Sequence, residues 1–337
     1  MKFSWDEINQ HILNKYDLLI CSASYEDRSI SFAYNCPDGK VSYALVCHYQ
    51  EYNEQVDKNL TSLRSILTAK NVQYDEAKLS HIDPIASVDT VILKFHALER
   101  DKRLGNVLID ITTFTREMLL ILLRVFHDLF PRTHVSYVYS NAEDYDPQAE
   151  DNKTTIDQKW LSKGITEIRS VIGYPGNLQP TNNTHLLIIV GYEYDRALSI
   201  ISELEPSSLS LAFGRSHSFT TEGDLSGKHY GAKEHFDELT SSALAYFPEE
   251  KFHVFEVSCN SPVKTKAEIE GHLHSIGVRK EQHNIIVFAL NNKPSTLGVG
   301  LYGIDNEDVQ LCYAPALLYN YGNYSKPGKY CYLFDGI

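Results

Sequence analysis

Short apolar runs alternate along the whole chain with stretches that favour helices. Runs such as NVLIDI (106–111) and NIIVFAL (284–290) are apolar almost throughout, which is typical of strands that are buried on both faces of a sheet. Strands that alternate with helices predict right-handed crossovers and parallel sheets covered by helices on both sides. We therefore expect an α/β protein.

The predicted elements follow the same order in the two halves of the chain. The first half gives strands at 17–23, 41–48, 72–75, 106–111 and 134–140, separated by helices at 27–34, 57–70, 85–100 and 115–129. The second half gives strands at 185–191, 208–213, 252–258, 284–290 and 309–314, separated by helices at 195–204, 232–247, 265–276 and 294–303.

Sequence similarity between the halves supports this repeat. Residues 16–33 and 184–202 each contain a Leu-Leu-Ile run followed, at the same spacing, by Asp-Arg. Residues 135–146 (VSYVYSNAEDYD) and 309–320 (VQLCYAPALLYN) share two tyrosine positions, Tyr139 with Tyr313 and Tyr145 with Tyr319. Repetition on this scale indicates copies of one structural unit. We therefore predict two tandem Rossmann-like domains, each with a doubly wound parallel sheet, that are related by internal duplication.

The repeat also predicts the domain limits. We expect an N-terminal domain over 1–146, a partly structured linker over 147–183 and a C-terminal domain over 184–337. The linker is rich in polar residues, Pro and Gly, and its YPGNLQPTNN end is turn-rich. We expect the tail GKYCYLFDGI to add an edge strand.

Length and composition fit a globular protein with two domains. The 337 residues are long for one core and suit two domains. Hydrophobic residues make up 43% and charged residues 22% of the chain, and both are ordinary values. No apolar run approaches the roughly 20 residues that a membrane span requires, and the start MKFSWDEINQHIL is too acidic for a signal peptide. We therefore expect a cytoplasmic protein.

The net charge argues against long nucleic acid as a partner, and the cysteine pattern argues against a metal site. The formal net charge is −13, which disfavours long nucleic acid because such binding depends on Lys and Arg. The six cysteines are scattered, without a Cys-x-x-Cys pair or a zinc-like Cys/His spacing. We interpret them as core residues in a reducing compartment and expect neither a metal nor a cofactor.

Two polar loops in each half are expected to meet at one edge of the sheet. Open parallel sheets bind ligands beyond the carboxyl ends of their strands, where the strand order reverses. This rule pairs loop 22–28 with loop 112–116, and loop 191–196 with loop 291–295. The loops after the fourth strands carry hydroxyl, amide and cationic groups at helix starts, which suit phosphate. The loops after the first strands add carboxylates, which suit ribose hydroxyls or base amino groups.

These loops, together with Arg215 and a tyrosine that could stack on a base, define the candidate ligand-binding residues. They are Ser24, Glu26, Asp27, Arg28, Thr112, Thr113, Thr115, Arg116, Tyr192, Glu193, Asp195, Arg196, Arg215, Asn291, Asn292, Lys293, Ser295 and Tyr319.

The turns after the fourth strands carry a family resemblance. LIDITTFTREMLLIL and VFALNNKPSTLGVGL resemble the ligand-binding turn of CRISPR-associated Rossmann fold (CARF) domains and of the SAVED sensors, which are built as two fused CARF-like halves. The family's Asn-x-Thr-Gly-Gly-Thr-Lys run stands here as DITTFTR (110–116), without its glycines, so Thr112, Thr115 and Arg116 carry over, as does Lys293 in the second half. The resemblance implies binding of cyclic or linear oligonucleotide second messengers in prokaryotic antiviral defence.

Three hypotheses for function remain open. The leading one is a sensor that binds a small nucleotide-type ligand and signals through a partner protein, either as a monomer or as a homodimer. It is favoured because the chain has no GxSxG, P-loop or HExxH motif. The second is a hydrolase that cleaves glycosidic or phosphodiester bonds with Glu26 or Glu193 as nucleophile or general base. The third is a structural, pseudo-dimeric interaction protein whose Asp-Arg pairs cap helices or hold an interface.

Overall fold

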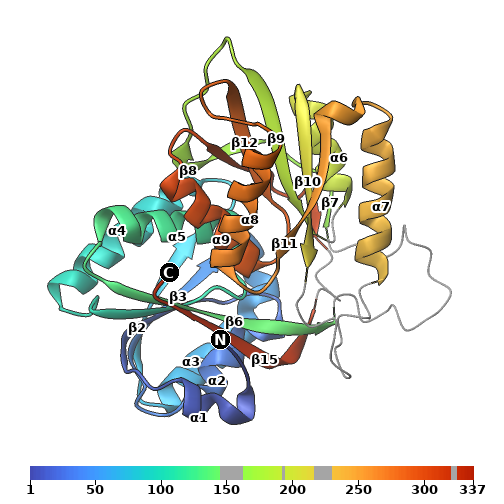
Figure 1. Cartoon of the computed structure of the whole chain (residues 1–337). Coiled ribbons are helices and arrows are strands. Elements are labelled where there is room, and N and C mark those ends of the chain that lie inside the picture. The colour runs from blue at the N-terminus through green and yellow to red at the C-terminus, as the bar shows by residue number, and fades with distance from the viewer. Residues whose placement is uncertain (145–161, 192–193, 216–229, 320–324) are drawn as a thin grey trace. The chain divides into compact units, whose positions relative to one another are not determined.

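The computed structural model describes residues 1–144, 162–191, 194–215, 230–319 and 325–337. The chain is α/β, with mixed sheets in which most strand pairs are parallel (Figure 1). It divides into two compact units. Unit 1 comprises Met1–Pro147 and Tyr321–Ile337, and unit 2 comprises Gln148–Asn320. Among the described residues, no helix is both long and apolar enough to cross a membrane.

Unit 1 is built on one seven-stranded sheet in the order β1-β15-β6-β5-β2-β3-β4. Strands β2 to β6 are parallel to one another, whereas β15 pairs antiparallel with β6 and with β1. The strands are β1 (Lys2–Ser4), β2 (Tyr16–Ser22), β3 (Val41–Tyr49), β4 (Gln73–Leu79), β5 (Asn106–Asp110), β6 (His134–Asp144) and β15 (Lys326–Asp335). The helices are α1 (Ile8–His11), α2 (Ser31–Asn35), α3 (Asn53–Ala69), α4 (Pro84–Arg100) and α5 (Arg116–Leu129).

Unit 2 is built on a six-stranded sheet in the order β11-β10-β9-β12-β13-β8. Strands β9 to β13 are parallel, and β8 pairs antiparallel with β13. The strands are β8 (Arg169–Pro175), β9 (Asn183–Val190), β10 (Ser208–Arg215), β11 (Phe252–Ser258), β12 (His283–Ala289) and β13 (Gln310–Tyr313), and a separate pair joins β7 (Ser162–Lys163) to β14 (Leu318–Tyr319). The helices are α6 (Tyr194–Leu204), α7 (Tyr230–Leu244), α8 (Pro262–Ser275) and α9 (Lys293–Asp305).

The two sheets share one arrangement of their five parallel strands. In chain order, the first strand is central, the second and third extend to one side, and the fourth and fifth extend to the other. The order therefore reverses between β2 and β5 in unit 1 and between β9 and β12 in unit 2. The loops that follow these four strands all leave from carboxyl ends at a point of reversal.

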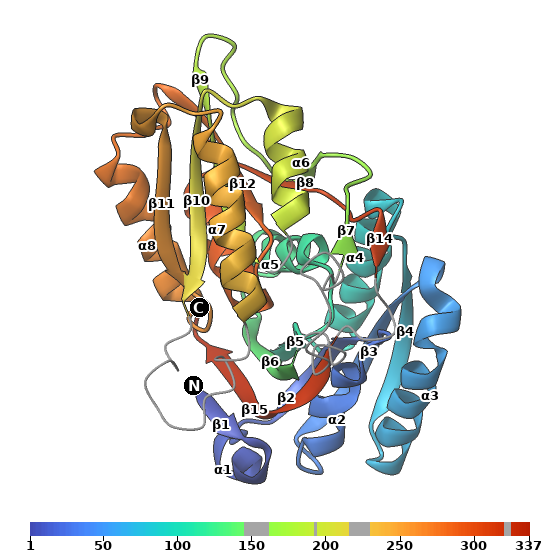
Figure 2. The same ribbon diagram turned by 90° about the vertical axis from the view of Figure 1, so that its right-hand side faces the viewer.

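Helices cover both faces of each sheet, as the two views show for each unit (Figure 1, Figure 2). In unit 2, apolar residues of β9 such as Leu186 and Ile188 pack with α6 and α7. On the other face, α8 contacts β10 through His272, which bonds to Ser210. The near-continuous apolar runs in the sequence are therefore explained by burial on both sides.

Most predicted elements are confirmed within a few residues, because they depend on local periodicity. The predicted helix 85–100 is α4 (Pro84–Arg100), and the predicted strand 284–290 is β12 (His283–Ala289). The predicted helix 27–34 instead begins as a tight 3-10 turn over Asp27–Ile30 and continues as the short helix α2.

Two segments differ from the expected domain limits. β8 (Arg169–Pro175) falls in the stretch expected to be a linker, yet it forms the sixth strand of unit 2 through its pairing with β13. The C-terminal tail forms β15 as a strand, but it pairs with β6 of unit 1 and is flanked by β1, so it is neither an edge strand nor a part of unit 2. Each segment pairs with a strand that is distant in the sequence: β8 with β13, and β15 with β6.

Candidate functional site

Each unit buries one arginine at the start of the helical segment that follows its central strand. Arg28 is 3% exposed and Arg196 is 1% exposed. The Arg28 guanidinium donates to the Ser140 carbonyl at 3.1 Å, and the Arg196 guanidinium donates to the Ala314 carbonyl. Ser140 and Ala314 occupy the same place in the similar stretches 135–146 and 309–320. Both arginines thus tie the first strand-to-helix turn to the fifth strand of the same unit.

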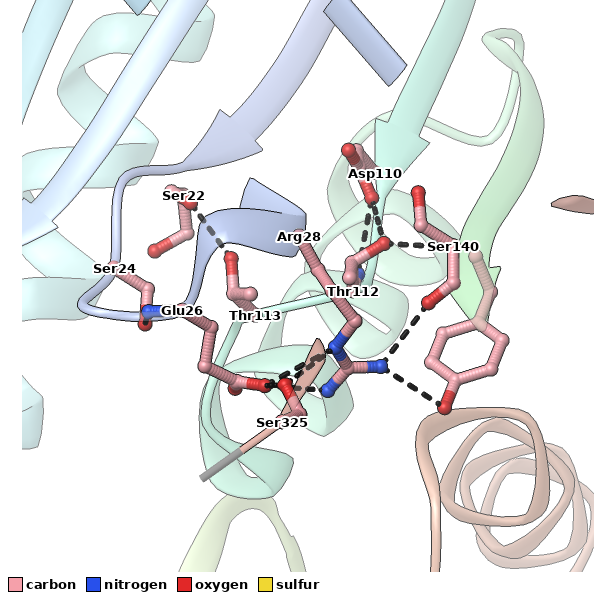
Figure 3. Close-up of polar contacts among 10 residues, drawn as sticks. Ser22, Ser24, Glu26, Arg28, Asp110, Thr112, Thr113, Ser140 and Ser325 are labelled. Carbon is pink, nitrogen blue, oxygen red and sulfur yellow. Dashed lines mark hydrogen bonds and ion pairs between the residues drawn. The ribbon is translucent and has the colours of Figure 1, made fainter. Parts of the chain in front are cut away.

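The charge of Arg28 is balanced by a buried carboxylate (Figure 3). Arg28 donates to one oxygen of Glu26 through Nη2 at 2.6 Å and through Nε at 3.1 Å. Ser325, just before β15, accepts from Arg28 Nε at 2.9 Å and donates to Glu26 at 2.5 Å. Arg28 also donates to the Tyr139 hydroxyl at 3.4 Å. Because a buried ion pair needs such additional bonds to offset its desolvation, this cluster is closely fitted.

The same network continues to a second buried carboxylate, Asp110 (Figure 3). The Ser140 amide donates to the Thr112 hydroxyl at 2.9 Å, and that hydroxyl donates to Asp110. The Thr112 amide also donates to Asp110 at 3.1 Å. Burial raises the pKa of Asp110 to about 6, although the bonds from Thr112 oppose this change. A proton on Asp110 is therefore linked, through Thr112 and Ser140, to the environment of Arg28.

The two expected loops lie together in both units. In unit 1, the Thr113 hydroxyl donates at 2.7 Å to the carbonyl of Ser22, the last residue of β2. In unit 2, the Asn291 amide group donates at 2.8 Å to the carbonyl of Val190, the last residue of β9. The loop after the fourth strand is therefore bonded to the carboxyl end of the central strand in each unit.

Helices α5 and α9 both begin at these loops. The Thr115 hydroxyl accepts from the Met118 amide at 3.1 Å, and the Asn292 side-chain oxygen accepts from the Ser295 amide at 3.1 Å, so both residues are N-caps. The first helical residue after each cap is basic and half-buried: these are Arg116 in α5 and Lys293 in α9.

In unit 2, two glycines let the loop 290–292 pack closely against the strand ends. A Cβ atom at Gly191 would lie 2.3 Å from the Leu290 carbonyl oxygen, and one at Gly214 would lie 2.2 Å from the Asn291 side-chain nitrogen. Such contacts require glycine. The Asn292 side chain also donates to the Cys259 carbonyl at 2.7 Å. Sequence reasoning missed these glycines, although a glycine at the end of a buried strand is a visible signal of close approach.

The remaining candidates of unit 1 have structural partners. The Ser24 hydroxyl accepts from the Glu26 amide at 3.3 Å, and the Ser24 carbonyl accepts from Asn59 at 2.8 Å. Asp27 is exposed and pairs with Lys58 at 3.1 Å, whereas Arg28 pairs with Glu26.

The remaining candidates of unit 2 are spread more widely. Arg215 pairs with Glu256 at 3.2 Å and with Glu268 at 2.6 Å. Ser295 is buried in the first turn of α9, Asp195 is half-buried at the start of α6, and Tyr319 lies in β14 opposite Ser162 of β7. Tyr192 and Glu193 lie outside the described residues.

Two serines that the sequence did not indicate complete the arginine clusters. Ser325 contacts Arg28, as described above, and the Ser162 hydroxyl accepts from Arg196 at 3.4 Å. Ser162 follows the connection from β6 of unit 1, and Ser325 follows the connection from β14 of unit 2. Each buried arginine is therefore contacted by the segment through which the chain enters its unit from the other unit.

Comparison of the chain with models of known protein families and with curated proteins found no match in either set. Across the described ranges, no group of three or more His, Cys, Asp or Glu side chains is arranged to hold a metal ion.

Proposed function

We propose that the protein is a sensor that binds a small nucleotide-type ligand at the carboxyl edges of its sheets and signals through a partner protein. One observation carries the proposal: in both units a basic residue, Arg116 or Lys293, is the first residue of a helix that begins where the strand order reverses.

A basic side chain at this position adds to the positive charge of the helix end. The N-terminus of a helix carries a partial positive charge, so a basic side chain there costs about 0.3–1 kcal/mol. The same position offers backbone N–H groups, and an added cation would strengthen their attraction for phosphate. In both units, a phosphate ligand would thus be attracted by the helix end and by the basic side chain together.

The proposal includes a duplicated architecture. We infer that the two units are copies of one Rossmann-like, doubly wound unit. Support comes from the shared strand order and from two contacts made at matching positions, which are Arg28 to Ser140 and Arg196 to Ala314. In such sheets, ligands bind at the point where the order reverses.

The resemblance to CARF domains and SAVED sensors suggests the ligand class, which is a cyclic or linear oligonucleotide messenger of prokaryotic antiviral defence. Among the residues that carry the resemblance, Thr112 is buried and bonded to Asp110, and the Thr115 hydroxyl is bonded to Tyr49 at 2.9 Å and caps α5. Arg116 and Lys293, with the backbone amides beside them, are therefore the groups that we assign to the ligand.

The hydrolase hypothesis finds less support in unit 1. Its base or nucleophile would be Glu26, but the carboxylate of Glu26 accepts bonds from Arg28 and Ser325. A guanidinium partner stabilises the ionised carboxylate and makes it a weaker base and a weaker nucleophile. This arrangement supports binding rather than catalysis.

Isothermal titration with a panel of cyclic oligoadenylates, cyclic dinucleotides and NAD tests the proposal. We expect at least one member to bind and to be recovered unchanged after incubation with the protein. If no member of the panel binds, the proposal is wrong, and if the bound member is converted to a product, the hydrolase hypothesis replaces it.

A further inference from the structure

The four edge strands of the two sheets differ in how they discourage pairing with another chain. Edge strands are usually shortened, charged or interrupted, because an open edge pairs with other strands. β1 has three residues, β4 carries Asp75, Glu76 and Lys78, and β8 ends at Pro175 with a shift of register in its pairing. β11 (FHVFEVS) is seven residues long and has one formal charge, on Glu256.

The backbone of β11 exposes a defined set of polar groups. The Cys259 amide donates to the Arg215 carbonyl of β10 at 3.0 Å. Because the direction of the backbone groups alternates along a strand, Phe255 and Val257 also point their N–H and C=O groups toward β10. The corresponding groups of Val254 and Glu256 therefore point away from the sheet.

The amides at both ends of this outward edge are already bonded. The Phe252 amide donates to the Glu249 carbonyl, and the Ser258 amide donates to the Glu268 carboxylate at 2.6 Å. Between these ends, the N–H and C=O groups of Val254 and Glu256 have no partner in the described part of the chain. The Val254 side chain is 46% exposed. The open stretch is thus short, and the amides on both sides of it are bonded.

We propose that β11 is the dimerisation edge of this protein, and that its occupant is β11 of a second copy. Two such strands that run antiparallel about a two-fold axis through Phe255 place Val254 of one copy opposite Glu256 of the other.

This register bonds the N–H and C=O groups of Val254 and Glu256, since each residue donates and accepts. It leaves the outward Phe252 carbonyl unbonded, because the Ser258 amide opposite it already donates to Glu268. Centring the axis on Glu256 instead would place the Val254 carbonyl opposite the Ser258 amide, which is already used, and would set the two Glu256 carboxylates opposite each other. The dimer joins two six-stranded sheets into one.

The register gives charge substitutions at Val254 opposite effects. A glutamate there would face Glu256 of the other copy, and like charges on opposed strands repel. A lysine there would face the same carboxylate and be attracted to it. If β11 were only a solvent-exposed edge, neither substitution would change the oligomeric state, and the particle mass measured in solution would stay the same.

Light scattering after size-exclusion chromatography tests this arrangement. The unmodified protein is expected at twice the 38.3 kDa chain mass, Val254→Glu at the monomer mass, and Val254→Lys at the dimer mass. Lys78→Glu on the exposed edge β4 is the matched control and should remain dimeric. A monomeric unmodified protein, a dimeric Val254→Glu, or an equal dissociation of the Glu and Lys variants would each overturn the proposal. Circular dichroism checks that each variant is folded.

A cross-linking variant tests the register independently of dimer strength and of Val254→Glu. At the two-fold axis, the two copies of residue 255 form a non-hydrogen-bonded pair with Cα atoms about 4.5 Å apart, which is within reach of a disulfide. Phe255→Cys should therefore form a covalent dimer under mild oxidation, seen on a non-reducing gel, whereas Lys78→Cys should not. Equal cross-linking of the two variants, or none in either, contradicts the proposed register.

Discussion

The two units bury an arginine at the same position but surround it differently. Arg28 and Arg196 each donate to a carbonyl at the fifth strand of their unit. Each also contacts a serine in the segment through which the chain enters that unit. Two residues before the arginine, unit 1 has Glu26, which forms an ion pair with Arg28, whereas unit 2 has Tyr194. The arginine-to-carbonyl bond is thus a shared structural element, and in unit 1 it is joined by the Glu26–Arg28 pair with its link to Asp110.

The largest effect is expected from breaking the ion pair of unit 1. Arg28→Ala leaves the Glu26 carboxylate buried without its cation, which should lower the free energy of unfolding by about 3–5 kcal/mol. The double variant Glu26→Ala/Arg28→Ala removes both charges and should be more stable than Arg28→Ala alone. Urea denaturation measures both.

Arg100→Ala is the control, because Arg100 is exposed in the last turn of α4, and it should cost less than about 1 kcal/mol. If the double variant lost as much stability as Glu26→Ala and Arg28→Ala together, Glu26 and Arg28 would not depend on each other.

The second effect is a difference between the two units in how their stability depends on pH. In unit 2, burial lowers the pKa of His185 to about 3 and that of His272 to about 4, and neighbouring histidines add to this. Below about pH 6.5, the unfolded chain binds protons at these histidines and folded unit 2 does not. Unit 2 should therefore lose stability as the pH falls from 6.5 toward 4.

Asp110 makes a contribution of opposite sign in unit 1, where buried His48, whose pKa is lowered by burial, acts in the same direction as the histidines of unit 2. Its folded-state pKa is raised from 3.8 to about 6, so its contribution to stability is fully present below pH 3.8 and is lost as the pH rises through about 6. The contribution is on the order of 3 kcal/mol. Hydrogen exchange, corrected for intrinsic rates, should show unit 2 opening first at pH 4.5, and Asp110→Asn should remove the acid stabilisation of unit 1. Parallel pH responses of the two units would contradict this account.

A smaller effect is expected from the close packing of the loop in unit 2. Gly214→Ala would place a methyl group 2.2 Å from the Asn291 nitrogen and 2.4 Å from the Cys259 sulfur, and it should destabilise unit 2 by about 1–3 kcal/mol. Gly271→Ala is the matched control. It lies within α8 and a Cβ there meets nothing within 4 Å, so it should stabilise the protein by up to about 1 kcal/mol. Thermal unfolding of both variants distinguishes packing from a general effect of alanine.

The sequence predicted those features that depend on local pattern. Strands, helices and the polar loops at their carboxyl ends follow from periodicity and from the strand order that the repeat implies. The loops around Thr113 and Asn291 do lie beside the central strands.

Features that depend on distant partners were not visible in the sequence. Nothing local in the tail indicates that Ser325 reaches Arg28, or that β15 pairs with β6. Arg28 and Arg196 were expected to face a ligand because they follow polar loops, but their burial is decided by the fifth strand of each unit. The raised pKa of Asp110 likewise depends on tertiary burial.

The central claim is that Arg116 and Lys293 mark equivalent anion-binding positions in the two units. Isothermal titration of the variants with the tightest ligand of the nucleotide panel tests it most directly. Arg116→Ala and Lys293→Ala should each weaken binding about tenfold, which corresponds to about 1.4 kcal/mol, and Arg100→Ala should leave it unchanged. Unchanged binding in both variants, or equal weakening in Arg100→Ala, would contradict the claim.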